Sequence, residues 1–270
     1  MLISFIIAGF VCAVAALCYA EMASMVPVSG SAYTYSYASM GEIVAWIVGW
    51  ALILEYAIAA SAVSVGWSNY FVGLVQSGLG LELPTFFTKG AFAAVGGGIN
   101  LPAVVIALLV TGLLVLGTKE SAMFNAVLVV IKVVALTAFV VLAVPVMKME
   151  NFEPFAPLGF GGISAAAASI FFAYVGFDAV STAAEETKNP QRNMPIGLIG
   201  SLVICTIFYL LVASGAIGAV GAQPVFGAAG EALAAGSKEL QQQCAALAGA
   251  GNVPLVCSDE ALAHVLREIG

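Results

Sequence analysis

The chain has 270 residues, of which 62% are hydrophobic and 9% charged, and its mean hydropathy is +1.07. A soluble domain carries roughly 25% charged residues, so this chain cannot cover a globular surface with charge and is an integral membrane protein. Its net charge of −7 disfavours nucleic acid as a partner. One His and five Cys leave little material for a metal site, and we expect neither a metal nor another cofactor.

Six apolar stretches are long enough to cross a bilayer, which needs about 20 residues of helix. The alternating hydrophobicity of a membrane barrel is absent. The sequence therefore predicts an all-α transmembrane bundle over residues 1–220. Its expected spans are residues 2–20, 43–66, 100–117, 123–147, 163–184 and 196–220.

The two ends of the chain lead to further expectations. Met1 is followed at once by apolar residues, and the first basic residue is Lys89, so neither a signal peptide nor an orienting charge begins the chain. We interpret this as a start inside a longer protein, the alternative being a naturally short leader. Residues 221–270 are rich in Ala and Gly, and we expect an extracytoplasmic loop that leads towards a further helix. The charges of the short loops favour this orientation slightly.

Cysteine and tyrosine positions outside the spans suggest two local features. Cys244 and Cys257 share the loop expected outside the cell, and we hypothesise a disulfide between them because that compartment permits oxidation. The alternating Tyr33, Tyr35 and Tyr37 are interpreted as the interfacial anchor of a loop helix rather than a binding site.

Three ionisable residues lie where an ionised side chain costs at least about 2.5–3.5 kcal/mol. Lys132 is about ten residues into its span, which indicates a functional role inside the bundle; a tilted helix that lets the amine reach headgroups is the alternative. Glu55 is either a site residue or a hydrogen-bonded anchor between helices, and an ion pair with Lys132 is conceivable. Asp178 follows Gly176 in mid-span, which suggests a broken helix, although a continuous helix stays open.

A broken helix has a chemical use in a membrane. Irregular backbone is tolerated at that depth only inside protein or beside a cavity. Its unpaired N–H groups can hold a carboxylate, and its unpaired C=O groups can hold an ammonium group. Since amino acids carry both charges on one carbon, such a segment suits them better than sugars or lipids.

Three motifs resemble the amino acid permeases of the amino acid–polyamine–organocation superfamily, in its cationic amino acid transporter-like branch. Residues 171–195 read FFAYVGFDAVSTAAEETKNPQRNMP, like the sixth helix and following loop of that family. Residues 16–21 and 27–37 read ALCYAE and PVSGSAYTYSY, like its second helix and first cytoplasmic loop. Residues 42–56 begin EIVAWIVGW and end LEY, like its third helix, with Ala51 where that branch often has Asp.

The resemblance implies a partial five-plus-five inverted-repeat bundle containing family helices two to seven, the sixth one broken. The unwound turn would contact the substrate, with Phe172 or Phe177 closing over it as a gate. Lys132 would couple transport to protons, and Glu55 would line the site. The candidate substrate-binding residues are Phe172, Ala173, Tyr174, Gly176, Phe177, Asp178 and Glu55.

The leading functional hypothesis is secondary active uptake of amino acids, coupled to protons as a symport, with alternating access. The expected location is the cell membrane, as in a bacterial inner membrane. The expected partners are amino acids, protons, lipid and the missing N- and C-terminal helices, without which the chain alone would be inactive. A membrane enzyme is disfavoured because the spans contain no His and no Ser/His or paired-Asp arrangement. A channel or non-transporting subunit is the remaining alternative.

Overall fold

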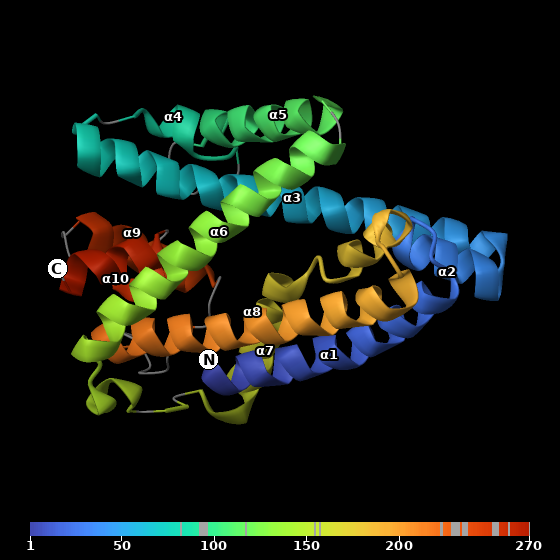
Figure 1. Cartoon of the computed structure of the whole chain (residues 1–270). Helices are drawn as coiled ribbons and strands as arrows, with labels where there is room; N and C mark the ends of the chain where they lie inside the picture. The colour runs from blue at the N-terminus through green and yellow to red at the C-terminus, as the bar shows by residue number, and fades with distance from the viewer. Residues whose placement is uncertain are drawn as a thin grey trace. The chain divides into compact units, whose positions relative to one another are not determined.

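The structure is a computed structural model, and it describes residues 1–81, 83–91, 97–116, 118–153, 155–156, 158–221, 224–227, 233, 237–249, 254–258 and 260–269. Helices dominate these residues. The α-helices are α1 (Leu2–Met25), α2 (Ser31–Met40), α3 (Glu42–Leu79), α4 (Thr85–Thr88), α5 (Leu101–Leu116), α6 (Thr118–Ala143), α7 (Gly159–Phe171), α8 (Pro190–Val220), α9 (Lys238–Gly249) and α10 (Ala261–Ile269) (Figure 1). Short 3-10 helices are η1 (Val144–Val146), η2 (Met149–Phe152), η3 (Phe172–Tyr174), η4 (Asp178–Glu186) and η5 (Leu255–Cys257).

Five stretches of the described chain are long and apolar enough to cross a membrane, which confirms an all-α transmembrane protein. They are Leu2–Met25, Glu42–Leu79, Ala122–Val146, Gly159–Glu185 and Pro190–Val220. The third expected span is shorter than the rest, because α5 has 16 residues and rises about 24 Å against a hydrocarbon thickness of about 30 Å. In contrast, α3 has 38 residues and continues well beyond its expected end at residue 66.

The chain divides into two compact units, which are described separately. Unit 1 contains Met1–Tyr56 and Glu153–Ser214, and unit 2 contains Ala57–Phe152 and Gly215–Gly270. Helix α3 therefore begins in unit 1 and ends in unit 2, and the end of α8 also belongs to unit 2.

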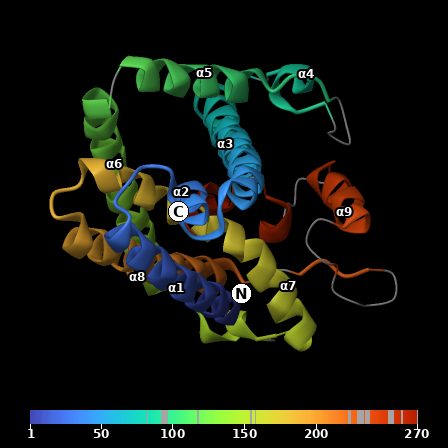
Figure 2. The ribbon, with the colours of Figure 1, turned by 90° about the vertical axis from the view of Figure 1, so that its right-hand side faces the viewer.

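In unit 1, α1 packs along α7 (Figure 2), and small buried residues let the helices approach closely. Ala8, Cys12 and Ala16 lie on one face of α1 and form a core with Tyr174. Gly9 marks the closest approach, because a Cβ atom there would lie 3.0 Å from the hydroxyl of Tyr174. A second core of unit 1 joins α1, α2, η4 and α8 through Ala23, Tyr35, Ala184 and Met194.

In unit 2, side-chain hydrogen bonds fix the helix ends. The amide oxygen of Asn100 caps α5 by accepting the N–H of Ala103 at 3.1 Å, and it also accepts the buried hydroxyl of Ser68 at 2.6 Å. At the end of α8 the carbonyl of Gly218 accepts the backbone N–H of Lys148 at 2.9 Å and the amide of Asn151 at 2.7 Å. The loop after α6 is therefore bound to the end of α8.

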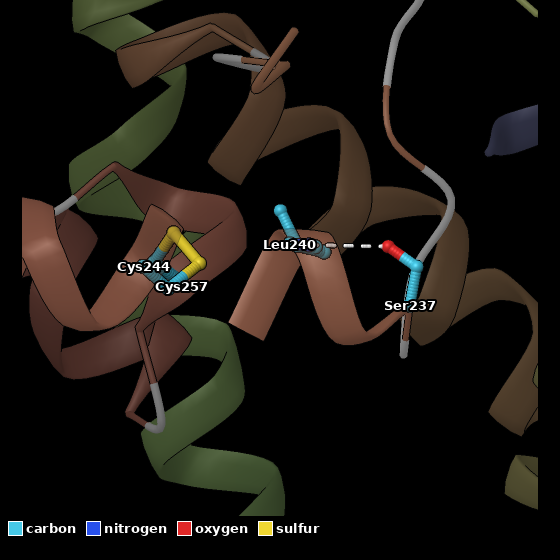
Figure 3. The surroundings of a disulfide bond; sticks show 4 residues. All are labelled: Ser237, Leu240, Cys244 and Cys257. Carbon is cyan, nitrogen blue, oxygen red and sulfur yellow. Dashed lines mark hydrogen bonds between the residues drawn. A yellow bond between two sulfur atoms is a disulfide. The ribbon is translucent and has the colours of Figure 1, made fainter. Parts of the chain in front are cut away.

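The tail of unit 2 contains a disulfide between Cys244 of α9 and Cys257 of η5, with the two Cα atoms 5.4 Å apart (Figure 3). Ser237 caps α9, because its hydroxyl accepts the N–H of Leu240 at 3.2 Å. Helix α10 packs against α6 and buries Val265 completely. Short helices thus form in the tail, although residues 222–223, 228–232, 234–236, 250–253, 259 and 270 of the expected loop lie outside the described residues.

Candidate functional site

The helix that begins with α7 is interrupted in the middle of its membrane span, inside unit 1. Regular α-helix ends at Phe171, the 3-10 turn η3 follows, and Gly176 then has φ = +109° before η4 begins. That backbone conformation is rarely open to a residue with a Cβ atom. The predicted break therefore lies at Gly176, and the hydrogen bonds beside it span three residues, from Val175 to Phe172 and from Ala179 to Gly176.

Several backbone groups at this turn lack a well-formed hydrogen bond. Within the described chain, no hydrogen bond of normal geometry is donated by the N–H groups of Gly176 and Phe177 or accepted by the C=O group of Val175. Unpaired backbone groups inside a membrane protein each cost several kcal/mol unless something satisfies them. The turn thus offers two donors and an acceptor within three consecutive residues, which matches the two charges of a zwitterion.

Asp178 lies directly after this turn and is buried, with 4% of its surface exposed. Its Oδ2 atom accepts the hydroxyl of Tyr56 at 2.5 Å. Its backbone carbonyl accepts the hydroxyls of Ser181 at 2.6 Å and of Ser31 at 3.3 Å. The carboxyl group is therefore held by α3, while its main chain is held by α2 and by η4 itself.

Glu55 precedes Tyr56 on α3 and is half-buried. The two carboxyl groups are close enough for their charges to interact. Two neighbouring acids favour a cation or a proton between them. No group of three possible metal ligands (His, Cys, Asp or Glu) occurs among the described residues.

The aromatic residues of the turn differ in their surroundings. Tyr174 is buried and donates its hydroxyl to the carbonyl of Phe5 at 3.2 Å, which indicates a structural role. The carbonyl of Ala173 accepts the hydroxyl of Tyr209 at 2.8 Å. Phe177 packs edge-on against Tyr19 with ring centroids 5.8 Å apart, whereas Phe172 is 43% exposed. Phe172 is therefore the freer of the two proposed gates.

Lys132 lies on α6 in unit 2, and its side chain is exposed. Glu55 belongs to unit 1, so an ion pair between these residues stays a prediction. Among the described residues, the one ion pair joins Arg267 to Glu260 at 2.9 Å.

Sequence reasoning missed the hydroxyl groups near Asp178. Tyr33 and Tyr37 are exposed on α2, as an interfacial anchor requires. Tyr35 is only 6% exposed and faces the interior, so the prediction that all three tyrosines anchor the helix at the interface was wrong for Tyr35. The cause is the helical period, which separates Tyr35 from its neighbours by about 200°. Burial raises the pKa of Tyr35, and the nearby Ser181 hydroxyl opposes that shift in part.

A contact at the end of η4 joins it to the loop before α2. The Oε1 atom of Glu185 accepts the backbone N–H of Ser29 at 2.8 Å, and both residues are exposed. The exposed end of η4 is thus fastened to the loop before α2, and its buried end is held by Ser31 at the start of α2.

The chain is similar to known transporters over most of its length. Residues 1–232 match the family model described as amino acid permease. The branched-chain amino acid permease BcaP of Bacillus subtilis is 52% identical over 218 residues, covering 78% of this chain and 46% of that protein. The methylthioribose transporter of the same organism is 49% identical over 212 residues, with the same coverage of both chains.

A plant relative, the vacuolar cationic amino acid transporter 4 of Arabidopsis thaliana, is 38% identical over 228 residues, covering 81% of this chain and 37% of that protein. The chain thus spans about half the length, or less, of these relatives. All of them are transporters rather than enzymes, and the bacterial ones support an inner-membrane location for this multi-pass protein. Together with the interrupted helix, these matches show that the chain belongs to the amino acid permease family.

Proposed function

We propose that this chain forms part of a secondary active transporter that takes up amino acids by alternating access. The observation that carries this proposal is the interrupted helix at Gly176, with two unpaired N–H groups and one unpaired C=O group beside the buried Asp178. In a membrane such groups are stabilised when a ligand supplies the missing hydrogen bonds.

The two ends of the turn suit the two charges of the substrate. The N–H groups of Gly176 and Phe177 would donate to the α-carboxylate, and the carbonyl of Val175 would accept from the α-ammonium group. Negative charge on Asp178 and Glu55 would attract the ammonium group. Phe172 would close over the bound molecule and exclude water.

Lys132 would couple this cycle to protons. Its amine would carry a proton as the site opens first to one face of the membrane and then to the other. Because the chain spans about half the length of its relatives, we propose that further helices of a longer protein complete the pathway. The 270-residue chain expressed alone is then expected not to transport.

The names of the relatives provide a set of candidate substrates to be tested. Their names specify branched-chain amino acids, methylthioribose and cationic amino acids. Methylthioribose carries no ammonium or carboxylate group and would leave the charged ends of the turn unmatched. We therefore place amino acids first and methylthioribose second.

The test is uptake by the full-length protein in proteoliposomes. Labelled leucine, lysine and methylthioribose are offered with and without an inward proton gradient. We expect one of the amino acids to accumulate only with the gradient, and Lys132→Ala to abolish accumulation while leaving exchange at equilibrium. The matched control is Lys89→Ala, an exposed lysine outside the spans.

The outcomes separate the competing functions. Equal uptake with and without the proton gradient would contradict a role of Lys132 in proton coupling. A flux that does not saturate with substrate would indicate a channel. Binding and uptake that are absent for every substrate would indicate a non-transporting subunit.

A further inference from the structure

Hydroxyl side chains from four elements of unit 1 gather around Asp178. They come from α1, α2, the start of α3 and η4, so segments distant in sequence supply them. We call this set the hydroxyl cluster, and its members are Tyr19, Ser31, Tyr35, Tyr56 and Ser181.

One hydroxyl of the cluster bonds the carboxyl group itself, and others lie close to that hydroxyl or bond the carbonyl of Asp178. Tyr56 donates its hydroxyl directly to the carboxyl group of Asp178. Ser31, which donates to the carbonyl of Asp178, also lies close enough to the hydroxyls of Tyr56 and Tyr19 to interact with both. Each hydroxyl can donate one hydrogen bond and accept others, so these groups can form a chain that begins at the carboxyl oxygen.

Tyr35 supplies an independent observation. It is more than nine-tenths buried, and its hydroxyl has no hydrogen-bond partner in normal geometry within the described chain. That hydroxyl lies close enough to Ser181 to interact with it, and the Ser181 hydroxyl bonds the carbonyl of Asp178. Buried hydroxyl groups are almost always paired, so an unpaired one that faces a polar cluster indicates a place where a small donor or acceptor comes and goes.

The backbone at the start of α2 is strained in a way that positions Ser31. Its φ angle is +51°, and the preceding Gly30 has φ = +140°. A side chain at Gly30 would collide with Thr34, since a Cβ atom would lie 2.0 Å from its hydroxyl oxygen. A non-glycine residue with positive φ costs of order 1–3 kcal/mol, and this strain places the fully buried Ser31 between Asp178 and the loop.

The cluster lies between a buried acid and an exposed one. Because η4 is a 3-10 helix, residues three apart share a face, which places Asp178, Ser181 and Ala184 together, each with no more than 4% of its surface exposed. The next residue after Ala184 is Glu185, which is exposed and accepts the backbone N–H of Ser29 in the loop before α2. The buried face of η4 that begins at Asp178 therefore ends beside a residue that holds the loop before α2.

We propose that the hydroxyl cluster is a proton-exchange path between the carboxyl group of Asp178 and the aqueous side bearing the 26–31 loop. In each transfer the O–H bond of the donor breaks as an O–H bond forms on the neighbouring oxygen. That neighbour passes its own proton onward. One proton leaves Asp178, one reaches water, and no group is oxidised or reduced.

The transport consequence rests on the proposed function, because a proton lost from Asp178 would leave a carboxylate free for a substrate ammonium group. The path itself does not need transport and is measured separately. The titratable groups that interact with Asp178 are Tyr19 of α1 and Glu55 and Tyr56 of α3, and Tyr35 of α2 lies next to Ser181.

Infrared spectroscopy of the full chain in lipid nanodiscs tests the path. The carboxylic-acid band that disappears in Asp178→Asn is first followed against pH. At the pH of its half-maximum the sample is transferred to deuterated buffer, and the rate of the deuterium shift is recorded. We expect Ser31→Ala and Tyr35→Phe each to slow that shift by about tenfold or more, as for loss of a positioned proton donor.

Matched controls come from the same helix. Tyr33→Phe removes an exposed tyrosine, and Ser39→Ala removes a serine that bonds only the carbonyl of Tyr35. Both are expected to keep the wild-type rate. Since Tyr35→Phe keeps the ring packed, its thermal midpoint should stay near wild type, which distinguishes a relay from a structural hydrogen bond. Unchanged rates in both test variants, or no Asp178 band at any pH, would overturn the proposal, whatever the uptake assay shows.

Discussion

The hydroxyl of Tyr56 donates a 2.5 Å hydrogen bond to the carboxylate of Asp178, across 122 positions of sequence. This bond joins α3 to the segment that follows the helix break. It fixes the orientation of a buried carboxyl group that no ion pair of the described chain stabilises. A carboxylate in that position depends on its hydrogen bonds, because hydrogen bonds to charged groups contribute about 1.5–3 kcal/mol.

Tyr56→Phe is therefore expected to weaken substrate binding by about tenfold or more. The ring and its packing remain, but one oxygen of Asp178 loses its donor and the side chain turns more freely. Titration of the purified full-length protein with the transported amino acid measures the change. Tyr70→Phe on the same helix is the control, since Tyr70 is exposed and lies in unit 2. Equal affinity in both variants would contradict a role for the Tyr56 hydroxyl.

Gly176→Ala tests the turn itself. No atom lies within 4 Å of the position that a Cβ would occupy, so the expected cost is conformational rather than steric, of order 1–3 kcal/mol for a φ angle of +109°. Thermal unfolding in detergent should show a lowered midpoint, and substrate binding should be lost. Gly197→Ala within α8 also meets open space and is expected to leave the midpoint unchanged or raise it slightly. An unchanged thermal midpoint and unchanged substrate binding in Gly176→Ala would show that substrate binding does not need the helix break.

Gly9→Leu is expected to destabilise unit 1. Even a Cβ atom there would press on the Tyr174 hydroxyl at 3.0 Å and on the Thr206 hydroxyl at 3.2 Å, where α1, η3 and α8 meet. Overpacking of this kind costs roughly 1–3 kcal/mol, which thermal unfolding would detect. Gly112→Leu in α5 provides the comparison because nothing lies within 4 Å of its Cβ position. Similar midpoints for the two variants would contradict a close contact at Gly9.

Reduction of the Cys244–Cys257 disulfide is expected to loosen the tail and leave unit 1 intact. The bond closes a loop with a sequence separation of 13, and losing such a cross-link costs about 3 kcal/mol in the chain-entropy description. Hydrogen exchange should therefore rise in α9 and α10, with α1 and α7 unaffected. Because residues 221–270 are expected outside the cell, a membrane-impermeant reductant should break this bond in intact cells. Finding both thiols free before reduction would reject the pairing.

Several local features could be predicted from the sequence because each depends on a short stretch of chain. The sequence suggested a helix break near Gly176 and Asp178 but left a continuous helix open, and it placed Tyr33, Tyr35 and Tyr37 on a loop helix. The extent of α3 could not be predicted, since its apolar pattern continues past residue 66 without a residue that stops a helix. The inward orientation of Tyr35 could not be predicted either, because it depends on packing against α1, η4 and α8.

The sequence alone determined that this chain crosses a membrane as helices, because lipid gives the backbone no hydrogen bonds and apolar length and composition then suffice. It left open whether the helix around Gly176 is broken or continuous, and the structure decided for the break. Only the tertiary structure decided that Tyr56, Ser31 and Ser181 surround Asp178. Residues from three separate elements meet there through the packing of α2 and α3 on η4, and no local pattern in the chain specifies which hydroxyl reaches which carboxyl group.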